Sequence, residues 1–247
     1  MSEASLKRLY EDPATPLAVG ADCQHRQAKL LAAYAAGRRG SRLRCVDVGC
    51  GDGATMLTAL RMCADQGTPL DVVGLDWSAT GLERCRKEGI VVGRASVVEP
   101  GLPLRTGSVD IVVMSEIIEH LVDTDAALAE AYRALSPGGL ILVSTPNLAA
   151  WYNRILLATG TQPVFTEVSL KGIYGRPGSE VAGHLRIFTR RALAGLLAAN
   201  GFESAEFTGA QFEDVPRGAK WLDRLLCRTP SLASILLATA RKPPDRR

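Results

Sequence analysis

Apolar and polar positions follow two alternating patterns along this chain. Short apolar runs rich in β-branched residues, such as residues 109–114, are typical of strands buried in a parallel sheet. Between them, segments such as residues 123–135 repeat their apolar positions every three or four residues, which is typical of amphipathic helices. The alternation of the two patterns predicts an α/β fold.

The same criteria place the predicted elements along the chain. Strands are expected to end at Val48 and to span residues 70–75, 90–97, 109–114, 140–144, 202–208 and 232–240. Helices are expected over residues 4–10, 21–36, 54–66, 78–88, 123–135, 190–200 and 219–227. Residues 148–187 break the alternation with glycines, prolines and scattered aromatic residues, so we interpret them as an insertion after the fifth strand. The tail after residue 241 is expected to be disordered.

The turn after the first strand carries the strongest chemical signal. Gly49, Gly51 and Gly53 stand at alternate positions between that strand and the next helix, an arrangement that cradles ligands at a helix N-terminus. The turn lacks the Gly-Lys-Ser/Thr of a phosphate loop, and its spacing differs from Gly-x-Gly-x-x-Gly. Asp47 and Asp52 would repel a pyrophosphate. A ligand with an ammonium or sulfonium group suits this turn, which points to S-adenosylmethionine (SAM).

With these residues the chain resembles the class I SAM-dependent methyltransferases. Residues 47–53 look like their first motif, residues 107–120 resemble their fourth-strand region, and residues 135–146 resemble their fifth strand with its entry turn. The resemblance covers residues 40–147 and resumes over 184–208. It implies a Rossmann-like, doubly wound fold with a mostly parallel seven-stranded sheet and helices on both faces. It also implies SAM as the cofactor and S-adenosylhomocysteine as the product.

Candidate cofactor residues follow from the strand ends. Asp76 ends the second strand about 20 residues beyond the glycine turn, where a carboxylate binds ribose hydroxyls. Its alternative role is that of an acid at a helix N-terminus. Many relatives carry an acid after the third strand that holds the adenine; here Arg94 and its neighbours replace it, so the adenine contact stays open. The predicted cofactor site comprises Asp47, Gly49, Cys50, Gly51, Gly53, Asp76, Trp77, Ala95, Ser96, Met114, Ser115 and Glu116.

Two histidines are candidates for the catalytic base. His120 follows the fourth strand, and its neutral imidazole would accept a proton near pH 7. His184 closes the insertion at a position that resembles one facing the acceptor in relatives. Each histidine has a purely structural role as the alternative. A base is needed only where the acceptor loses a proton as the methyl group is transferred.

The predicted domain organisation is simple. Residues 1–40 are expected to form an N-terminal helical cap, and residues 41–247 a SAM-binding methyltransferase domain. Within that domain the insertion at about 148–187 is expected to form a lid and the acceptor pocket. Its aromatic residues and arginines suit a partly apolar or an anionic acceptor.

Composition narrows the class of partner. The net charge of +3 gives no argument for a nucleic-acid partner. Six cysteines are scattered without a Cys-x-x-Cys pair, so no metal site is predicted, and they suit a reducing cytoplasm. No signal peptide is apparent, and the apolar runs are too short to cross a bilayer. The oligomeric state cannot be predicted from these patterns.

The function predicted from the sequence is therefore SAM-dependent methyl transfer. The expected acceptor is a small molecule or a glycan- or lipid-linked intermediate, with oxygen favoured as the accepting atom through the resemblance to quinone- and glycan-pathway methyltransferases. Two alternatives remain at this point. One is a regulatory protein that binds SAM without catalysis, and the other is a nicotinamide-dependent dehydrogenase, against which the glycine spacing and Asp52 argue.

Overall fold

A computed structural model describes residues 11, 20–38, 41–99, 101–178 and 181–245. The predicted helix over residues 4–10 lies outside this part of the chain, as does most of the predicted N-terminal cap before residue 20. Within the described part, none of the helices has both the length and the apolar character needed to cross a membrane.

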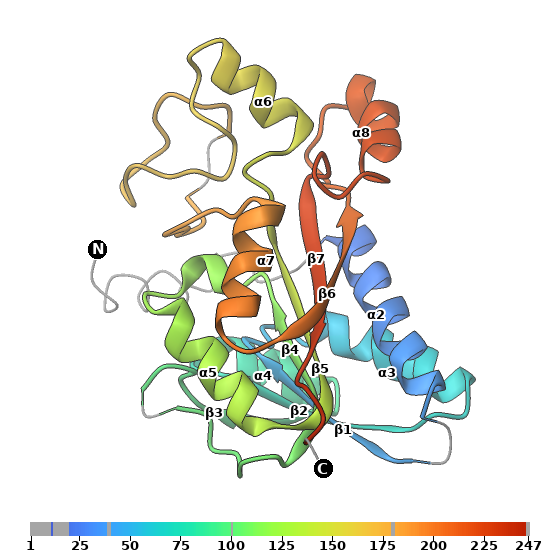
Figure 1. The fold of residues 1–247 in the computed structure, drawn as a ribbon. Coiled ribbons are helices and arrows are strands. Elements are labelled where there is room, and N and C mark those ends of the chain that lie inside the picture. Colours follow the sequence, from blue (N-terminus) through green and yellow to red (C-terminus); the bar gives the residue numbers. More distant parts are fainter. Residues whose placement is uncertain (1–10, 12–19, 39–40, 100, 179–180, 246–247) are drawn as a thin grey trace.

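One seven-stranded sheet forms the centre of the fold (Figure 1). Its strand order is β3-β2-β1-β4-β5-β7-β6. Every neighbouring pair from β3 to β5 is parallel, and β7 runs antiparallel to both β5 and β6. The strands are β1 (Leu43–Val48), β2 (Leu70–Asp76), β3 (Val91–Arg94), β4 (Val109–Ser115), β5 (Leu135–Pro146), β6 (Glu203–Ala210) and β7 (Ile235–Arg241). The predicted mostly parallel, Rossmann-like sheet is thus confirmed.

Helices connect these strands and cover the sheet. The α-helices are α2 (Ala21–Ala36), α3 (Ala54–Asp65), α4 (Ala79–Lys87), α5 (Thr124–Ala134), α6 (Trp151–Ala158), α7 (Arg190–Ala199) and α8 (Lys220–Leu226). Two short 3-10 helices, η1 (Ile118–His120) and η2 (Arg217–Ala219), precede α5 and α8. Polar side chains cap the start of three helices: Ser78, Asp123 and Thr189 each accept a backbone N–H of the first turn.

Alternation along the strands divides the apolar core between the two faces of the sheet. Val46 and Val112 point to the face covered by α5 and α7. Cys45 and Ile111, one position earlier on the same strands, join the core beneath α2, α3 and α4. Because successive side chains of a strand point to opposite faces, one buried run supplies both cores. Helices therefore cover both faces of the sheet. A ligand has access to the sheet at the edge where the strands end.

Helix α2 packs as part of the second core. Its side chains at Ala28, Leu31 and Ala35 are fully buried. The Gln27 side chain crosses to the sheet and donates from Nε2 to Ser115 Oγ at 2.8 Å. This helix lies within the predicted cap, and its buried face packs on the same sheet as the rest of the domain.

Three local features differ from the sequence predictions. Strand β5 begins at Leu135 and includes the turn expected over residues 136–139, which bulges so that Val109 pairs with Leu135 but Ile111 with Leu140. Helix α6 lies inside the insertion, where no helix was predicted. In the tail, Lys242 donates from Nζ to the carbonyls of Tyr132 and Leu135, so this residue is anchored rather than disordered.

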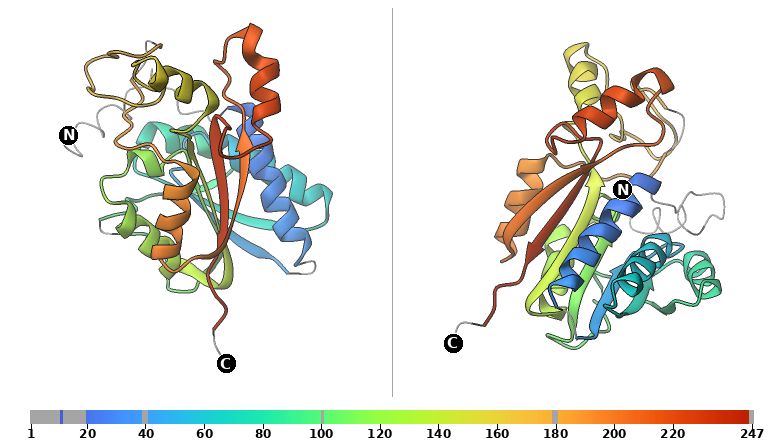
Figure 2. Two further views of the ribbon diagram at one scale, coloured as in Figure 1. Left: turned by 45° about the horizontal axis from the view of Figure 1, so that its top comes forward. Right: turned by 90° about the vertical axis from the view of Figure 1, so that its right-hand side faces the viewer.

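The segments outside the layered core gather at one end of the molecule. Figure 2 shows α6 and α8 together beyond the end of the sheet at which the parallel strands terminate. The indole Nε1 of Trp151 donates to Asp223 Oδ1 at 2.9 Å, which joins the start of α6 to α8. The insertion therefore stands over the carboxyl edge of the sheet, where ligands bind in open α/β folds.

Candidate active site

The glycine turn leads from β1 into α3 through left-handed backbone. Gly49, Gly51 and Gly53 have φ angles of +74°, +52° and +79°. Residues other than glycine rarely adopt this conformation. A Cβ at Gly49 would lie 2.5 Å from Ile117 Cδ1, so a side chain there would also force Ile117 to shift. The turn is closed by the N–H of Gly49, which donates to Leu75 O at 2.7 Å.

Asp76, at the end of β2, is bound to this turn. One carboxylate oxygen accepts the N–H of Gly51 at 3.0 Å, and the other accepts that of Ser78 at 2.8 Å. Burial raises the pKa of the Asp76 carboxyl, and these hydrogen bonds act in the opposite direction. Both roles weighed from the sequence are therefore compatible with its position: the carboxylate caps the start of α4 and also faces the cavity beside the glycine turn.

Asp47 has a buried oxygen that its surroundings do not satisfy. The residue is 1% exposed, and its Oδ1 has no hydrogen-bond partner among the described residues. Burial, helped by the charges of Asp76 and Asp52, raises the pKa of Asp47 to about 7. A buried carboxylate without a partner is costly, and an ammonium group beside it would remove the cost. The residues of the turn thus fit the amino-acid end of SAM.

A single cavity of about 1090 Å³ runs along the ends of the strands. Most of the predicted cofactor residues line it: Asp47, Gly49, Cys50, Gly51, Asp76, Trp77, Ala95, Ser96, Ser115 and Glu116. Both predicted catalytic residues, His120 and His184, line it as well. Residues at the ends of strands β1 to β4 thus line the same cavity as residues of the insertion.

Two predicted cofactor residues do not line the cavity. Met114 is fully buried in the core beneath α5, because its neighbour Ser115 takes the side of the strand that faces the cavity. Gly53 lies at the N-cap of α3, where a Cβ would stand 2.7 Å from both Cys85 Sγ and Ile90 Cδ1. These positions serve packing: Met114 fills the core, and Gly53 lets α3 approach α4.

Apolar residues near the predicted adenine position were missed by the sequence analysis. Val97, Val98 and Leu102 line the cavity after Ala95 and Ser96. Ser96 Oγ accepts the N–H groups of Val98 and Glu99 at 3.4 Å, so this side chain orders the loop. The short apolar run after β3 was the available signal, but it was assigned to the strand itself.

Two carboxylates follow β4 at the cavity wall. Glu116 has a φ of +51°, and its Oε1 is buried without a partner in the described chain. Burial raises the pKa of Glu116 to about 7. Glu119 is fully buried; its Oε2 accepts Thr145 Oγ1 at 2.9 Å, whereas its Oε1 has no hydrogen-bond partner in the described part of the structure. Burial and the charge of Glu116 raise the pKa of Glu119 well above its usual range.

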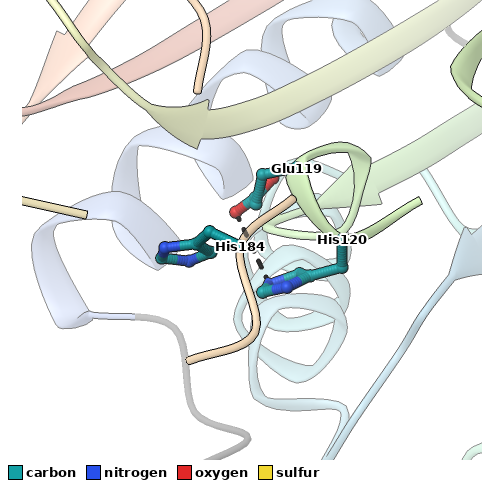
Figure 3. Close-up of side chains that lie close together, drawn as sticks. All are labelled: Glu119, His120 and His184. Atoms are coloured by element: carbon teal, nitrogen blue, oxygen red, sulfur yellow. Dashed lines mark ion pairs between the residues drawn. The ribbon is translucent and has the colours of Figure 1, made fainter. Parts of the chain in front are cut away.

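His120 and His184 lie beside Glu119. Their ring centroids are 4.8 Å apart, and His120 Nε2 is 3.8 Å from Glu119 Oε1 (Figure 3). Burial and the neighbouring His184 lower the pKa of His120 to about 3, and burial also lowers the pKa of His184. Both imidazoles are thus neutral at pH 7. This differs from the expected base titrating near pH 7, because burial disfavours the imidazolium.

The backbone of η1 holds the His184 segment in place. The carbonyl of Glu119 accepts the N–H groups of Leu185 and Arg186 at 2.9 and 3.3 Å. The Arg186 guanidinium then donates to Leu121 O at 2.7 Å and to Val122 O at 3.0 Å. The end of the insertion is therefore fixed against the loop after β4, which explains how two distant histidines meet.

The insertion supplies the outer wall of the cavity. Trp151, Tyr152 and Phe165 contribute aromatic surface, and Phe212 packs edge-on against Phe165 with centroids 4.7 Å apart. Glu167, also in the wall, accepts the N–H groups of two residues just before His184 and lies 3.6 Å from the Arg176 guanidinium. The cavity thus has a polar half at the glycine turn and a largely aromatic half with a histidine and carboxylate cluster.

Comparison with known proteins agrees with this geometry. Residues 21–206 match a family described as a methyltransferase domain. A probable S-adenosylmethionine-dependent methyltransferase of Mycolicibacterium smegmatis is 32% identical over 191 residues, covering 73% of this chain and 68% of that protein. A ubiquinone biosynthesis O-methyltransferase of Chelativorans sp. is 31% identical over 133 residues. This match covers 52% of this chain and 48% of the Chelativorans protein.

A solved structure has the same fold. The crystal structure of a SAM-dependent methyltransferase from Thermotoga maritima, described as a possible histamine N-methyltransferase, superposes with a TM-score of 0.56. The match covers 89% of this chain and 91% of that chain at 21% identity, which shows the fold and not the substrate. Family, fold and the cradle beside Asp47 and Asp76 agree. The chain belongs to the class I SAM-dependent methyltransferases, and S-adenosylmethionine is its cofactor.

Proposed function

We propose that this enzyme transfers the methyl group of SAM to an oxygen of a small, partly apolar acceptor. One observation carries the proposal: the cavity that contains Asp47 and Asp76 continues without interruption to the aromatic wall around Phe165 and His184. A donor bound at Asp47 and Asp76 and an acceptor bound at Phe165 and His184 would lie in the same cavity. Alignment of two reactants in such a site can supply roughly 7–11 kcal/mol of barrier reduction.

In the half of the cavity beside the glycine turn, the cofactor half, we assign each part of SAM to particular residues. Asp76 would bind the ribose hydroxyls, since a carboxylate can accept from both. Asp47 and the glycine backbone would hold the amino-acid end, because the unpartnered Oδ1 calls for a cation. Trp77 would contact the adenine together with Ala95 and Ser96, all of which line the cavity. SAM supplies an electrophilic methyl group; the chain orients it and excludes water.

The acceptor half favours a ring-bearing substrate with a polar group. Its walls include Tyr152 and Phe165, while His120 and His184 present polar edges to the same space. Relatives named ubiquinone biosynthesis O-methyltransferases support oxygen as the accepting atom, although the chain spans about half of their length. A glycan- or lipid-linked hydroxyl is the alternative acceptor of the same chemistry. The insertion over residues 148–187 would act as the lid.

The histidines are proposed to contact the acceptor. A side chain with a pKa of about 3, as burial gives His120, is a weak base at neutral pH. A neutral imidazole can still accept a hydrogen bond from an acceptor hydroxyl. We therefore expect His120→Ala and His184→Ala to lower turnover on the true acceptor. Full turnover in both variants would remove the histidines from the proposed mechanism.

An acceptor screen tests the proposal directly. The enzyme is incubated with SAM carrying an isotopically labelled methyl group and with matched phenols, aliphatic alcohols, carboxylic acids and amines, and products are read by mass spectrometry. We expect label on a hydroxyl of a ring-bearing compound, and much less label when Asp76→Ala replaces the wild type at a SAM concentration near the wild-type Kd. Label found only on nitrogen or carbon would contradict the oxygen assignment while leaving methyl transfer intact.

A further inference from the structure

Three side chains in the acceptor half of the cavity converge on one point. Glu119 and His120 belong to η1 after β4, and His184 comes from the end of the insertion; Figure 3 shows them gathered around a common space. Each offers one potential ligand atom, and these atoms all lie within 4.8 Å of one another. Ligand atoms on a tetrahedral metal ion with bonds of about 2.1 Å are about 3.4 Å apart. The 3.8 Å between His120 Nε2 and Glu119 Oε1 is close to that value.

The carboxylate of this cluster needs a partner. Glu119 is 0% exposed, and no hydrogen-bond donor in the described ranges reaches its Oε1. Glu116 Oε1, also buried and unpartnered in those ranges, adds a second carboxylate on the same cavity wall. A divalent cation between Glu119 and the histidines would satisfy the buried oxygen and offset the negative charge.

The surrounding hydrogen bonds orient the two histidines so that each Nε2 atom can bind a metal ion. His120 Nδ1 lies 3.2 Å from Gly183 O, and His184 Nδ1 lies 2.9 Å from Phe165 O. A carbonyl oxygen only accepts, so each Nδ1 carries the hydrogen and each Nε2 carries the lone pair. Thr145 Oγ1 orients the carboxylate in the same way by donating to Glu119 Oε2. Outer partners of this kind fix metal-binding side chains in proteins.

We propose that Glu119, His120 and His184 form a binding site for a divalent transition-metal ion. Two imidazoles and one carboxylate suit Zn²⁺, Fe²⁺, Co²⁺ or Mn²⁺ better than Ca²⁺, which takes mainly oxygen ligands. Three protein ligands leave coordination positions open, and all three residues line the cavity. The sequence analysis predicted no metal, because it considered cysteine pairs and could not foresee that His184 lies beside Glu119.

The open positions give the ion a role in the reaction. An acceptor hydroxyl bound there would be held next to the donor half of the cavity, and a metal ion lowers the pKa of a bound oxygen group. With the ion bound, the two Nε2 atoms hold the metal, and the acceptor hydroxyl contacts the ion instead of the imidazoles. This role rests on the proposed oxygen acceptor, whereas metal binding itself does not.

Metal binding can be measured without SAM or acceptor. The purified chain is stripped with a chelator and titrated with Co²⁺, read by visible absorption and by competition with a chromophoric chelator. We expect the wild type to bind one Co²⁺ per chain with the spectrum of a nitrogen- and oxygen-ligated ion, and Zn²⁺ to displace it. His25→Ala is the matched control, since His25 is the remaining histidine of the chain and is exposed on α2.

Ligand variants give the decisive comparison. His120→Ala, His184→Ala and Glu119→Gln should each weaken Co²⁺ binding by more than the roughly 10- to 100-fold expected from losing an outer partner, and Thr145→Val should fall within that range. Thermal unfolding of each stripped variant shows whether it folds; if Glu119→Gln does not, the histidine variants carry the comparison. Wild type that binds Co²⁺ no better than His184→Ala overturns the proposal. SAH binding to the stripped wild type separates that outcome from a failure of the cofactor site.

Discussion

Asp76 accepts the backbone N–H of Gly51 at 3.0 Å, so the end of β2 and the glycine turn after β1 form one rigid unit. The pairing depends on the parallel register in which Val48 lies opposite Leu75. Two neighbouring strand ends thus present a carboxylate and exposed backbone to the same cavity.

Replacing Asp76 should weaken cofactor binding. Asp76→Ala removes charge-assisted hydrogen bonds worth about 1.5–3 kcal/mol each, so the Kd for SAM should rise by roughly 10- to 150-fold per ribose bond lost. Isothermal titration with SAM measures the change. Asp71→Ala is the control: Asp71 lies on the same strand but outside the cavity, paired with Arg42 at 2.6 Å. Equal affinity of the two variants would reject the ribose assignment.

Binding of SAM should depend on the ionisation of Asp47. Burial raises the pKa of Asp47 to about 7, and only the ionised carboxylate attracts the donor's ammonium group. Affinity for SAM should therefore rise by about fivefold from pH 6 to pH 7, below the range in which the α-amino group of SAM loses its own proton. Asp47→Asn cannot ionise, so its affinity should be lower and flat over this range. A wild-type affinity that is constant from about pH 6 to pH 7 would contradict this assignment.

The same carboxyl should affect stability without ligand. Its pKa is raised on folding, so the folded state binds the proton more tightly than the unfolded chain. Between about pH 4 and pH 7 the unfolded chain holds fewer protons at this group, and its contribution to the free energy of unfolding falls as pH rises. Urea midpoints across this window should decline less in Asp47→Asn than in the wild type. A steeper decline in the variant would show that the sign is wrong.

A side chain at Gly49 should destabilise the protein. Gly49→Ala combines a positive φ with a contact of 2.5 Å to Ile117 Cδ1, whereas Gly67→Ala has a similar φ of +68° and nothing within 4 Å. The left-handed conformation costs about 1–2 kcal/mol in both, and the clash adds about 1–3 kcal/mol in the first. Urea unfolding should show a larger loss in the free energy of unfolding for Gly49→Ala than for Gly67→Ala. The dependence of that free energy on urea concentration should be the same in both variants. Similar losses in the two variants would mean that the turn can yield.

The anchor between Trp151 and Asp223 should hold the insertion. Trp151→Phe removes the indole donor and leaves Asp223 with its bond from Ser234 at 2.7 Å. We expect faster amide hydrogen exchange in α6 and a loss of about 1–3 kcal/mol in stability. Trp221→Phe is the control, because Trp221 is 68% exposed on α8. Unchanged exchange in α6 would show that other contacts hold the insertion.

Local patterns explain which parts could be predicted from the sequence. The strands, the glycine turn and Asp76 could be predicted because their signals are short apolar runs and residues that lie near one another in the chain. Met114 and Ser115 could not be separated in this way, because a strand buried on both faces does not indicate which face a residue takes. Their faces were decided by α5 packing on one side of β4.

Long-range contacts decide the rest of the site. His184 meets Glu119 because the N–H groups of Leu185 and Arg186 bond to the Glu119 carbonyl, and no sequence spacing encodes such a contact. Helix α6 was missed because Ile155 and Leu157 are each 56% exposed, so its apolar residues follow no buried stripe. Many residues that line the cavity beside the glycine turn were therefore predicted, whereas the meeting of His184 with Glu119 required the tertiary structure.

The most direct test of the central claim is a crystal structure of the enzyme saturated with S-adenosylhomocysteine. We predict electron density in the cavity, with the ribose against Asp76, the ammonium beside Asp47 and the backbone of Gly49 and Gly51 in contact with the amino-acid end. Density for the ligand elsewhere, or an empty cavity beside these residues at saturating ligand, would contradict the account.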